Sequence, residues 1–320
     1  MTSGPRAIIA IIVGVGSAVA SMQIGPYRPG ATSDLRWAWE GARALLHGLD
    51  PYTSIGAEGP LPGIAPNLWY PMPAVIVCMP LARLPLAVAN AVFVGVSGAF
   101  LAWALSRSVD GAHRLFVFGS AAWFVVLQNA QWSGLITAAG LVPSLGFLLA
   151  CKPSLGGALM VAYPSRRSVW GAALFVLVTV VIWPWWIPEW LASLRTAEHI
   201  KAPVTRFGGP LILLALLKWR RPEARLLAVL ACAPQTPNVY EAVPLFLIPA
   251  TWIESSALLV LTGIVYYRVQ TAAGLFPDMM AYLDATGQAM LIALYVPCLV
   301  MVLLRPNQGP EKDESMAVLA

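Results

Sequence analysis

One carboxylate in this sequence lies where it could take part in acid–base chemistry. Asp34 follows the first long uncharged run, 7–24, and begins a segment whose apolar residues recur with the spacing of one helical face. A carboxylate in the first turn of a helix is favoured by the helix dipole, so Asp34 could simply cap that helix. It could instead be a general base that accepts a proton from a hydroxyl group. The sequence is compatible with both roles.

Three further polar residues lie inside or beside long apolar runs, where such side chains are rare. Lys152 could hold an anionic group such as a phosphate, or it could be a lysine at a helix end whose charge reaches water. Asn129 and Gln131 lie within the uncharged run 115–151. Amides in such places either bridge neighbouring helices or contact a ligand. These residues are therefore candidates for binding a substrate.

Four residues are secondary candidates. Arg206 could bind an anionic group, and its alternative is a solvated loop charge. His199, in a Trp-rich segment, could be a second acid–base group. Glu241 ends the polar segment 235–241, and it could contact a substrate or cap a helix. Asp50 stands before a proline in a pattern typical of a turn, which is a structural role.

Cysteine and histidine spacing gives no indication of a metal centre. The chain has four cysteines and three histidines, with no CxxC pair and no His–Cys cluster. Zinc sites need such ligands at short, regular spacing. We therefore expect no metal and no cofactor.

The composition indicates that the elements holding these residues are membrane helices. Of the 320 residues, 58% are apolar and only 11% are charged, and the mean hydropathy is +0.72. A soluble domain carries about 25% charged residues, so a soluble enzyme, a collagen and a disordered chain are all excluded. The 27 prolines and 26 glycines predict broken helices, which the bilayer tolerates only against protein or a water-filled cavity.

Uncharged runs predict the membrane spans. A bilayer core of about 30 Å needs about 20 apolar residues in a helix. Together with shorter apolar runs, the long ones predict an all-α, polytopic protein of about ten to twelve transmembrane helices in one domain, 1–306. Arg6 and the apolar stretch after it are also typical of a cleavable signal peptide, but the later spans need no separate signal. The long runs are 7–24, 59–82, 84–106, 115–151, 168–188 and 285–304.

The distribution of cations predicts the orientation. Arg166-Arg167 and the segment 218–225 place six cations in two very short loops, and such loops stay on the cytoplasmic side. On this basis Arg83 is also cytoplasmic, 25–70 is the first outer loop and 307–320 is a cytoplasmic tail. Because the cations are scattered between apolar runs, a nucleic-acid partner is not indicated, and the lipid bilayer is the expected partner.

The first outer loop is predicted to contain an amphipathic helix over 34–47. Ser33 can cap its start, and Gly48 can end it in the left-handed conformation. This pattern is typical of a helix lying in the membrane interface, with Leu35 and Trp39 toward lipid. Apolar residues fall at 35, 38, 39, 42, 45 and 46, and the opposite stripe is Arg36, Glu40, Arg43 and His47.

The order of these motifs resembles a known family. Asp34 and the amphipathic helix are followed by Gly48-Leu49-Asp50-Pro51-Tyr52, Tyr70-Pro71-Met72-Pro73, Gln128-Asn129-Ala130-Gln131-Trp132 and Ala150-Cys151-Lys152-Pro153. Over roughly residues 5–190 this order is similar to the GT-C glycosyltransferases, specifically the polyprenyl-phosphate-dependent mannosyltransferase-like family. The segment around Gln131 departs from the family's Gly-Gln-x-Asn pattern, because the Gly-Gln pair is not intact. The C-terminal third matches least.

The resemblance implies a GT-C-like enzyme with its active site on the outer face of a bacterial plasma membrane. It would move a hexosyl group, mannose first, from a polyprenyl-phosphate donor to a hydroxyl of a glycolipid or glycan acceptor, with inversion. Asp34 would be the general base. The donor phosphate and substrate would be bound by Lys152, Arg206, Asn129 and Gln131.

A multi-pass transporter or lipid flippase without glycosyl transfer is the alternative. Such a protein needs ionisable groups along a path near the middle of the bilayer. In this sequence the acidic residues gather at the ends of the apolar runs and in the outer loops. That distribution favours chemistry at the membrane surface.

Overall fold

The computed structural model describes residues 3–24, 33–55, 67–107, 111–197, 201–272 and 275–308. Within these ranges every regular element is a helix, and the one backbone pairing of strand type is an isolated bridge between Lys201 and Gln235. The all-α prediction is therefore confirmed for the described part of the chain. The predicted tail lies largely outside it, because 309–320 are not described.

The first twelve helices of the described residues extend to residue 182, and most of them are short. In chain order they are α1 (Ser3–Ile24), α2 (Leu35–Leu46), α3 (Pro51–Ser54), α4 (Met72–Cys78), η1 (Met79–Leu81), α5 (Leu86–Leu105), η2 (Ala112–Gly119), α6 (Ala121–Asn129), α7 (Ser133–Leu141), η3 (Pro143–Cys151), α8 (Pro153–Ala162) and α9 (Arg166–Ile182).

The C-terminal half continues the pattern of short helices and adds one of 21 residues, α12. The elements are α10 (Trp186–Leu194), η4 (Pro203–Thr205), η5 (Gly209–Lys218), α11 (Pro222–Cys232), η6 (Val239–Leu247), α12 (Trp252–Ala272), α13 (Met279–Met290), the π-helix η8 (Leu291–Tyr295) and α14 (Val296–Leu303).

Full-length membrane spans are fewer than the sequence predicts. Among the described residues, three helical stretches are long and apolar enough to cross a membrane: Gly4–Ile24, Leu86–Leu105 and Met280–Leu303. A fourth is added if α9 and α10, which meet at a bend of 102°, count as one span. The chain has the apolar helices of a membrane protein, but the predicted ten to twelve spans are not present as continuous helices.

Helix breaks explain the difference in number. The run 115–151, predicted to hold two passes, forms three shorter helices, α6, α7 and η3, after the start of the run in η2. Ala130 ends α6 in the left-handed conformation, with φ of 49°. Pro143 opens η3 and Pro153 opens α8, since proline fits the first turn of a helix but not its interior.

The predicted span 59–82 also differs from the structure. Its described part forms α4 and η1, together Met72–Leu81, and such a short helix cannot cross a core of about 30 Å. The chain therefore reaches Arg83 without a full crossing, and Arg83 lines a surface hollow together with Arg43 and His47 of the first loop. Arg83 thus lies at the same end of the molecule as this loop, so the prediction that places the two on opposite sides of the membrane is wrong.

Small residues let α1 and α5 pack closely. A methyl group on Gly14 would touch Ala99, and one on Gly95 would touch Ala18. These pairs run in opposite directions along the two helices, so the helices are antiparallel. Small residues at a helix crossing allow the backbones to approach, which is how many helices associate in membranes.

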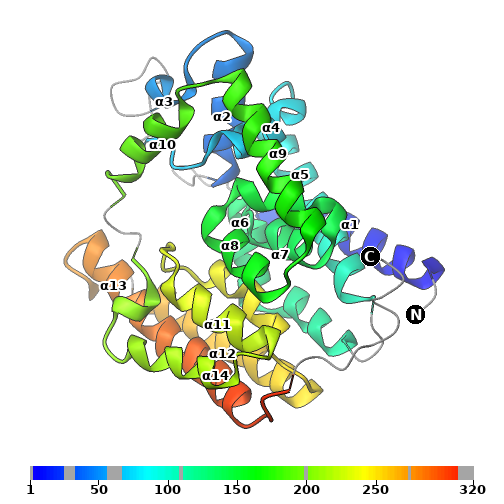
Figure 1. Ribbon diagram of the computed structural model, residues 1–320, viewed down its shortest axis with the longest axis vertical. Helices are drawn as coiled ribbons and strands as arrows, with labels where there is room; N and C mark the ends of the chain where they lie inside the picture. Colours follow the sequence, from blue (N-terminus) through cyan, green and yellow to red (C-terminus); the bar gives the residue numbers. More distant parts are fainter. Residues whose placement is uncertain are drawn as a thin grey trace.

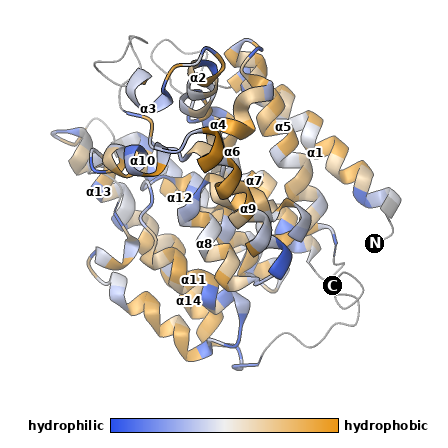
Figure 2. Ribbon diagram, turned by 45° about the horizontal axis from the view of Figure 1, so that its top comes forward, coloured by the Kyte–Doolittle hydropathy of each residue, from blue (hydrophilic) through white to orange (hydrophobic). Residues whose placement is uncertain are grey.

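The remaining helices surround a centre made of α6, α7 and α8 (Figure 1). The helices α2, α3 and α10 lie at one end, and α11, α12 and α14 lie at the opposite end. Figure 2 shows hydrophobic residues along α1, α5, α11 and α14, and a more polar composition over α2 and α3. Large apolar side chains are exposed on α9, including Trp170 at 73% and Val181 at 75%, as expected for helices that meet lipid.

The helix predicted over 34–47 is present as α2. Its buried residues include Leu35, Ala38 and Trp39, and the Trp39 indole donates a hydrogen bond of 2.9 Å to the carbonyl of Leu81. Gly48 has a φ of +71°, as the left-handed end predicts. In this structure the apolar side of α2 packs against α4 and η1, so Leu35 and Trp39 are buried in protein and do not face lipid as predicted. The placement of α2 in a membrane interface stays a prediction.

Candidate functional site

The backbone of Asp34 is at the N-cap position of α2, but its side chain does not cap the helix. Its φ and ψ of −69° and −24° are helical, and its carboxylate makes no capping hydrogen bond. A capping side chain normally requires an extended backbone at this position. The Ser33 hydroxyl, the other predicted cap, donates to Asn90 Oδ1 at 3.1 Å. The carboxylate is therefore available for other contacts.

Three side chains from distant parts of the chain gather around the Asp34 carboxylate. Lys152 and Glu241 both act on it electrostatically, and the Tyr240 side chain hydrogen-bonds to it. Lys152 Nζ donates to Glu241 Oε1 at 2.7 Å and lies 5.2 Å from the centre of the Tyr240 ring. The Glu241 side chain is 1% exposed and that of Lys152 is 14% exposed. We call these four residues the Asp34 cluster.

Burial gives Asp34 an unusual acidity. The pKa of Asp34 is raised from 3.8 to about 7, mainly because the surrounding protein desolvates the carboxylate. The Lys152 charge opposes the rise, the Glu241 charge adds to it, and the hydrogen bond from Tyr240 opposes it. Part of the Asp34 surface is still accessible. A carboxyl group with this pKa is divided between its acid and base forms near neutral pH, which suits a general base.

Each member of the cluster lies at a break between helices. Asp34 precedes α2, and Lys152 connects η3 to α8 with an extended backbone, φ of −140° and ψ of 81°. Tyr240 and Glu241 lie in the first turn of η6. Polar side chains in an apolar fold need partners, and helix breaks supply room for several to meet.

The two predicted amides contribute in different ways. Asn129 supplies its backbone carbonyl, which accepts a hydrogen bond of 2.7 Å from the Asp34 N–H. Gln131 is fully buried and acts electrostatically on Tyr240, and its Nε2 has no hydrogen-bond partner. Both residues therefore lie beside the cluster, although Asn129 acts through its main chain.

Aromatic residues form one wall beside the cluster. Trp132 is fully buried, with its ring 4.8 Å from that of Phe93 and 5.8 Å from that of Tyr70. Tyr70 is held in turn by Tyr52, whose hydroxyl donates to the Tyr70 carbonyl at 3.1 Å. Such rings can exclude water from a site and can stack on the apolar face of a sugar.

Several buried polar atoms near the cluster have no hydrogen-bond partner. They include Glu241 Oε2, Gln131 Nε2 and Trp132 Nε1. Most buried polar groups in proteins are paired, so an unpaired one points to a ligand or a water molecule as its partner. The hydroxyl groups of a sugar could satisfy both the donor and the acceptor atoms.

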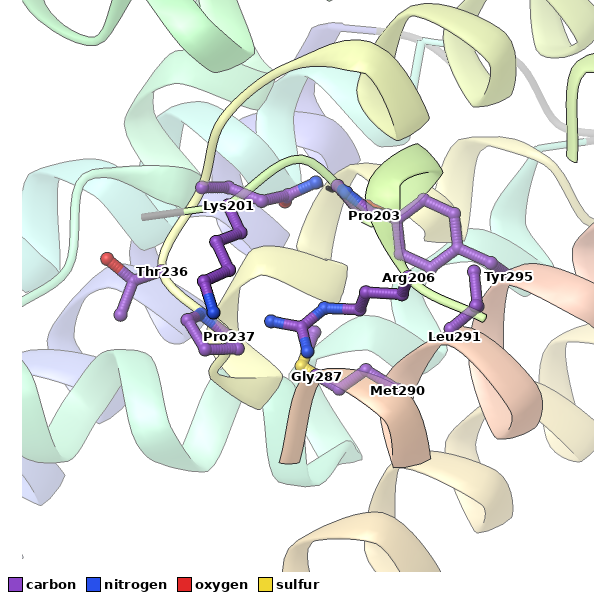
Figure 3. Close-up of a pocket in the computed structure, with 10 residues that line it drawn as sticks. Lys201, Pro203, Arg206, Thr236, Pro237, Gly287, Met290, Leu291 and Tyr295 are labelled. Carbon is purple, nitrogen blue, oxygen red and sulfur yellow. Dashed lines mark hydrogen bonds between the residues drawn. The ribbon is translucent and has the colours of Figure 1, made fainter. Parts of the chain in front are cut away.

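The other predicted site residues lie elsewhere. Asp50 caps α3, because its carboxylate accepts from the Tyr52 N–H at 2.9 Å, so the turn interpretation is correct. Arg206 pairs with Asp284 and lines a separate small pocket with Lys201 and Tyr295 (Figure 3). His199 lies outside the described residues.

Sequence reasoning assigned no role to Tyr240 or Tyr70. Tyr240 lies beside Glu241 in the polar segment 235–241, and that position was the available signal. The signal for Tyr70 was weaker: it lies in the aromatic stretch that precedes α4. Neither signal identifies a contact with Asp34, because the tertiary fold alone brings these segments together.

Comparison with family models, with curated proteins and with solved structures gave no match. The described residues contain no group of three or more His, Cys, Asp or Glu side chains that could hold a metal ion. The Asp34 carboxylate can accept a proton, and the Lys152 ammonium group can stabilise a negative charge beside it.

Proposed function

We propose that this chain is a membrane glycosyltransferase that moves a hexosyl group, mannose first, from a polyprenyl-phosphate donor to an acceptor hydroxyl. Asp34 is the general base. The observation that carries the proposal is the environment of Asp34, a non-capping carboxylate with a pKa of about 7 opposite Lys152. A catalytic base works best when its pKa lies near the operating pH.

The reaction needs few groups from the protein. Asp34 takes the proton of the acceptor hydroxyl, and the acceptor oxygen forms a bond to the anomeric carbon of the donor sugar. The bond from that carbon to the phosphate oxygen breaks, and the lipid phosphate leaves with the electron pair. A single displacement of this kind inverts the anomeric carbon and requires no covalent intermediate with the protein.

Lys152 is the group that stabilises the leaving phosphate. In this structure its ammonium is bound by Glu241, which keeps a cation available in a buried place. An ammonium group in a low-dielectric site stabilises a developing negative charge more strongly than an ammonium group in water does. Glu241 therefore positions Lys152. Its unpaired oxygen, Oε2, can accept a hydrogen bond from a hydroxyl group of the bound sugar.

The active site is proposed to face the outer leaflet of a bacterial plasma membrane. The Asp34 cluster adjoins the first loop, and the resemblance to GT-C enzymes assigns that loop to the outer side. The acceptor is a glycolipid or glycan, whose hydroxyl reaches the site from the membrane surface.

The test is sugar transfer by membranes that contain the Asp34→Asn variant. Membranes are incubated with labelled polyprenyl-phosphate mannose, and the labelled product is isolated and quantified. The matched control is Asp50→Asn, which removes a carboxylate of the same loop that only caps α3. We expect a loss of at least about 100-fold for Asp34→Asn and near-normal transfer for the control. Normal transfer by a well-folded Asp34→Asn protein would reject the assignment.

A proton-coupled transporter or flippase is the second candidate. It is favoured by one observation, that two carboxylates and a lysine form a mutually interacting buried group, since such groups also relay protons in membranes. Proteoliposomes distinguish the two. Movement of a labelled lipid or solute that needs Asp34 but no lipid-linked sugar would favour transport.

A further inference from the structure

A surface hollow lies at the C-terminal end of α2. Its volume is about 420 Å³, which is within the roughly 300–1,000 Å³ of pockets that bind small ligands. Two segments form it, the end of α2 and the turn before α5. The lining residues are Arg43, Leu46, His47, Ala82 and Arg83. The hollow therefore has room for a group the size of a lipid headgroup.

The hollow is positively charged. No described residue of its lining is acidic. The Glu40 carboxylate lies 3.8 Å from Arg43, whose side chain is 47% exposed, and it also faces Arg36 at 4.0 Å. An ion pair that is this long and this accessible to water is weak. Arg43 and Arg83 can therefore bind an anion, and the imidazole of His47 can donate a further hydrogen bond.

The two walls of the hollow are fixed to each other. The Trp39 indole of α2 donates to the carbonyl of Leu81 at 2.9 Å, directly before Ala82. The guanidinium of Arg43 lies over the same indole, 4.7 Å from the ring centre. One tryptophan thus joins α2 to the turn that carries Arg83 and also supports Arg43, so both arginines are held near the hollow before a ligand binds.

The hollow lies where the chain enters a membrane helix. Arg83 comes three residues before Leu86, the start of a helix that is long and apolar enough to cross a membrane. Cations at the end of such a helix lie at the level of the lipid headgroups. Two apolar side chains beside the hollow, Leu46 and Leu49, are exposed, and exposed leucines next to cations are typical of a surface that contacts lipid.

An exposed apolar ridge continues from this point along α5. Its residues are four positions apart and so lie on one face of the helix, and each is 37–43% exposed: Val88, Val92, Val96 and Phe100. From the first to the last the ridge is about 18 Å long. This length is slightly more than half of a hydrocarbon core of about 30 Å. The ridge therefore matches an acyl chain that occupies one leaflet.

We propose that the hollow binds the phosphate headgroup of an anionic phospholipid from the surrounding bilayer, with an acyl chain along the ridge of α5. The guanidinium groups of Arg43 and Arg83 donate to the phosphate oxygens, and Leu46 contacts the start of the chains. A zwitterionic headgroup fits less well, because it would bring an ammonium group close to two arginines.

This headgroup site is distinct from the proposed reaction site. The donor phosphate is bonded to the carbon that the acceptor attacks, so it must lie beside Asp34. Leu46 is at the other end of α2, a helix of 12 residues and therefore about 18 Å long. The proposal concerns the binding of a bilayer lipid, so it does not depend on glycosyl transfer.

Lipid binding to the purified full-length protein tests the proposal. The protein in a neutral detergent is titrated with dioleoyl phosphatidylglycerol, and bound lipid is measured by native mass spectrometry. The reference probes are dioleoyl phosphatidylcholine, which has the same chains, and inorganic phosphate. We expect saturable binding of phosphatidylglycerol, at least about fivefold weaker binding of phosphatidylcholine, and no displacement of lipid by inorganic phosphate.

The other outcomes overturn the proposal. Equal binding of the two lipids would reject an anionic headgroup site. Displacement of the lipid by inorganic phosphate at a similar concentration would show a site for a soluble anion. The absence of saturable binding would reject the site altogether.

Variants locate the bound headgroup. Arg83→Gln and Arg43→Gln should each weaken phosphatidylglycerol binding about fivefold, because one arginine beside an anionic lipid contributes about 1 kcal/mol. Both side chains are exposed, so neither change should prevent folding. The matched control is Arg195→Gln, which removes the same charge from an exposed position after α10. Unchanged binding in both variants, or equal weakening in the control, would overturn the assignment. Weakening in Lys152→Met alone would place the lipid in the Asp34 cluster instead.

Photo-cross-linking tests the path of the acyl chain. A phosphatidylglycerol with a diazirine in one acyl chain is photoactivated on the protein, and labelled residues are mapped by peptide mass spectrometry. We expect more label on 88–100 of α5 than on the exposed residues of 8–19 in α1, and less label on α5 in Arg83→Gln. Equal label on the two helices, or label on α5 that is unchanged in Arg83→Gln, would contradict the proposed path.

Discussion

Replacing Asp34 with asparagine should stabilise the protein at high pH while it abolishes transfer. The folded state raises the pKa of Asp34 from 3.8 to about 7. Between these two values the folded protein binds a proton that the unfolded chain has already lost, so wild-type stability falls as the pH rises. Above about pH 7 both states are ionised and the loss is complete. Asparagine is neutral at every pH, so the Asp34→Asn protein does not lose stability in this way.

The magnitude follows from the same pKa. Between pH 5.5 and 7 ionisation of Asp34 lowers the free energy of unfolding of the wild type by about 1.4 kcal/mol per pH unit, or about 2 kcal/mol in total. This is an upper value, because water reaches part of the Asp34 surface and screens its charge. We therefore expect the stability difference between Asp34→Asn and wild type to grow by about 1–2 kcal/mol from pH 5.5 to pH 8.5.

The assay is thermal unfolding of the two detergent-solubilised proteins at both pH values. At about 2–4 °C per kcal/mol, the melting temperature of the variant should gain a few degrees on wild type as the pH rises. Comparing the two pH values cancels any effect of the amide itself. Asp50→Asn, which keeps a capping side chain at the start of α3, is the control for replacing a carboxylate of this loop by an amide. An Asp34→Asn protein whose melting temperature follows wild type at both pH values would refute the reasoning.

Three further predictions concern the same site and its loop. The transfer rate of the wild type should rise roughly tenfold between about pH 6 and pH 8, with a midpoint near the Asp34 pKa, as a pH–rate profile would show. Glu241→Gln should lower the unfolding free energy by about 3 kcal/mol in denaturant titrations, because it leaves buried Lys152 without its carboxylate. In any active protein that remains, the same change should move the midpoint to lower pH, since the Glu241 charge raises the Asp34 pKa. Asp50→Ala should lower the free energy of unfolding by about 1 kcal/mol, seen as a lower melting temperature, because it removes the cap of α3. Sugar transfer should be unchanged.

The Asp34 cluster shows how far residue types alone can lead. Charged and amide side chains are rare in an apolar chain, so Asp34, Lys152, Gln131 and Glu241 could each be identified as unusual. What they do together could not be derived, because the Lys152–Glu241 contact spans 89 positions along the chain. The alternative for Asp34, a side chain that caps the helix, was decided by its helical backbone and by the lack of a capping hydrogen bond from its carboxylate.

The number of full-length spans was the main error of the sequence interpretation. An uncharged run indicates only that its residues are removed from water. Helices that are broken at Ala130 or Pro143 can bury these residues just as a continuous helix can. The placement of Arg83 failed for the same reason, because the helix before it, Met72–Leu81, is too short to cross. Counting apolar residues measures burial and does not measure helix length.

The sequence by itself determined the class of the protein, the helical nature of its segments, and the positions of the helix α2 and its left-handed end at Gly48. These features depend on composition and on contacts between near neighbours, which a linear pattern records. Only the tertiary structure decided that Tyr240 faces Asp34, that Arg206 lies in a pocket of its own, and that the carboxyl group of Asp34 has a pKa of about 7. These properties arise from desolvation and from charges on distant segments, and no local pattern in the chain encodes them.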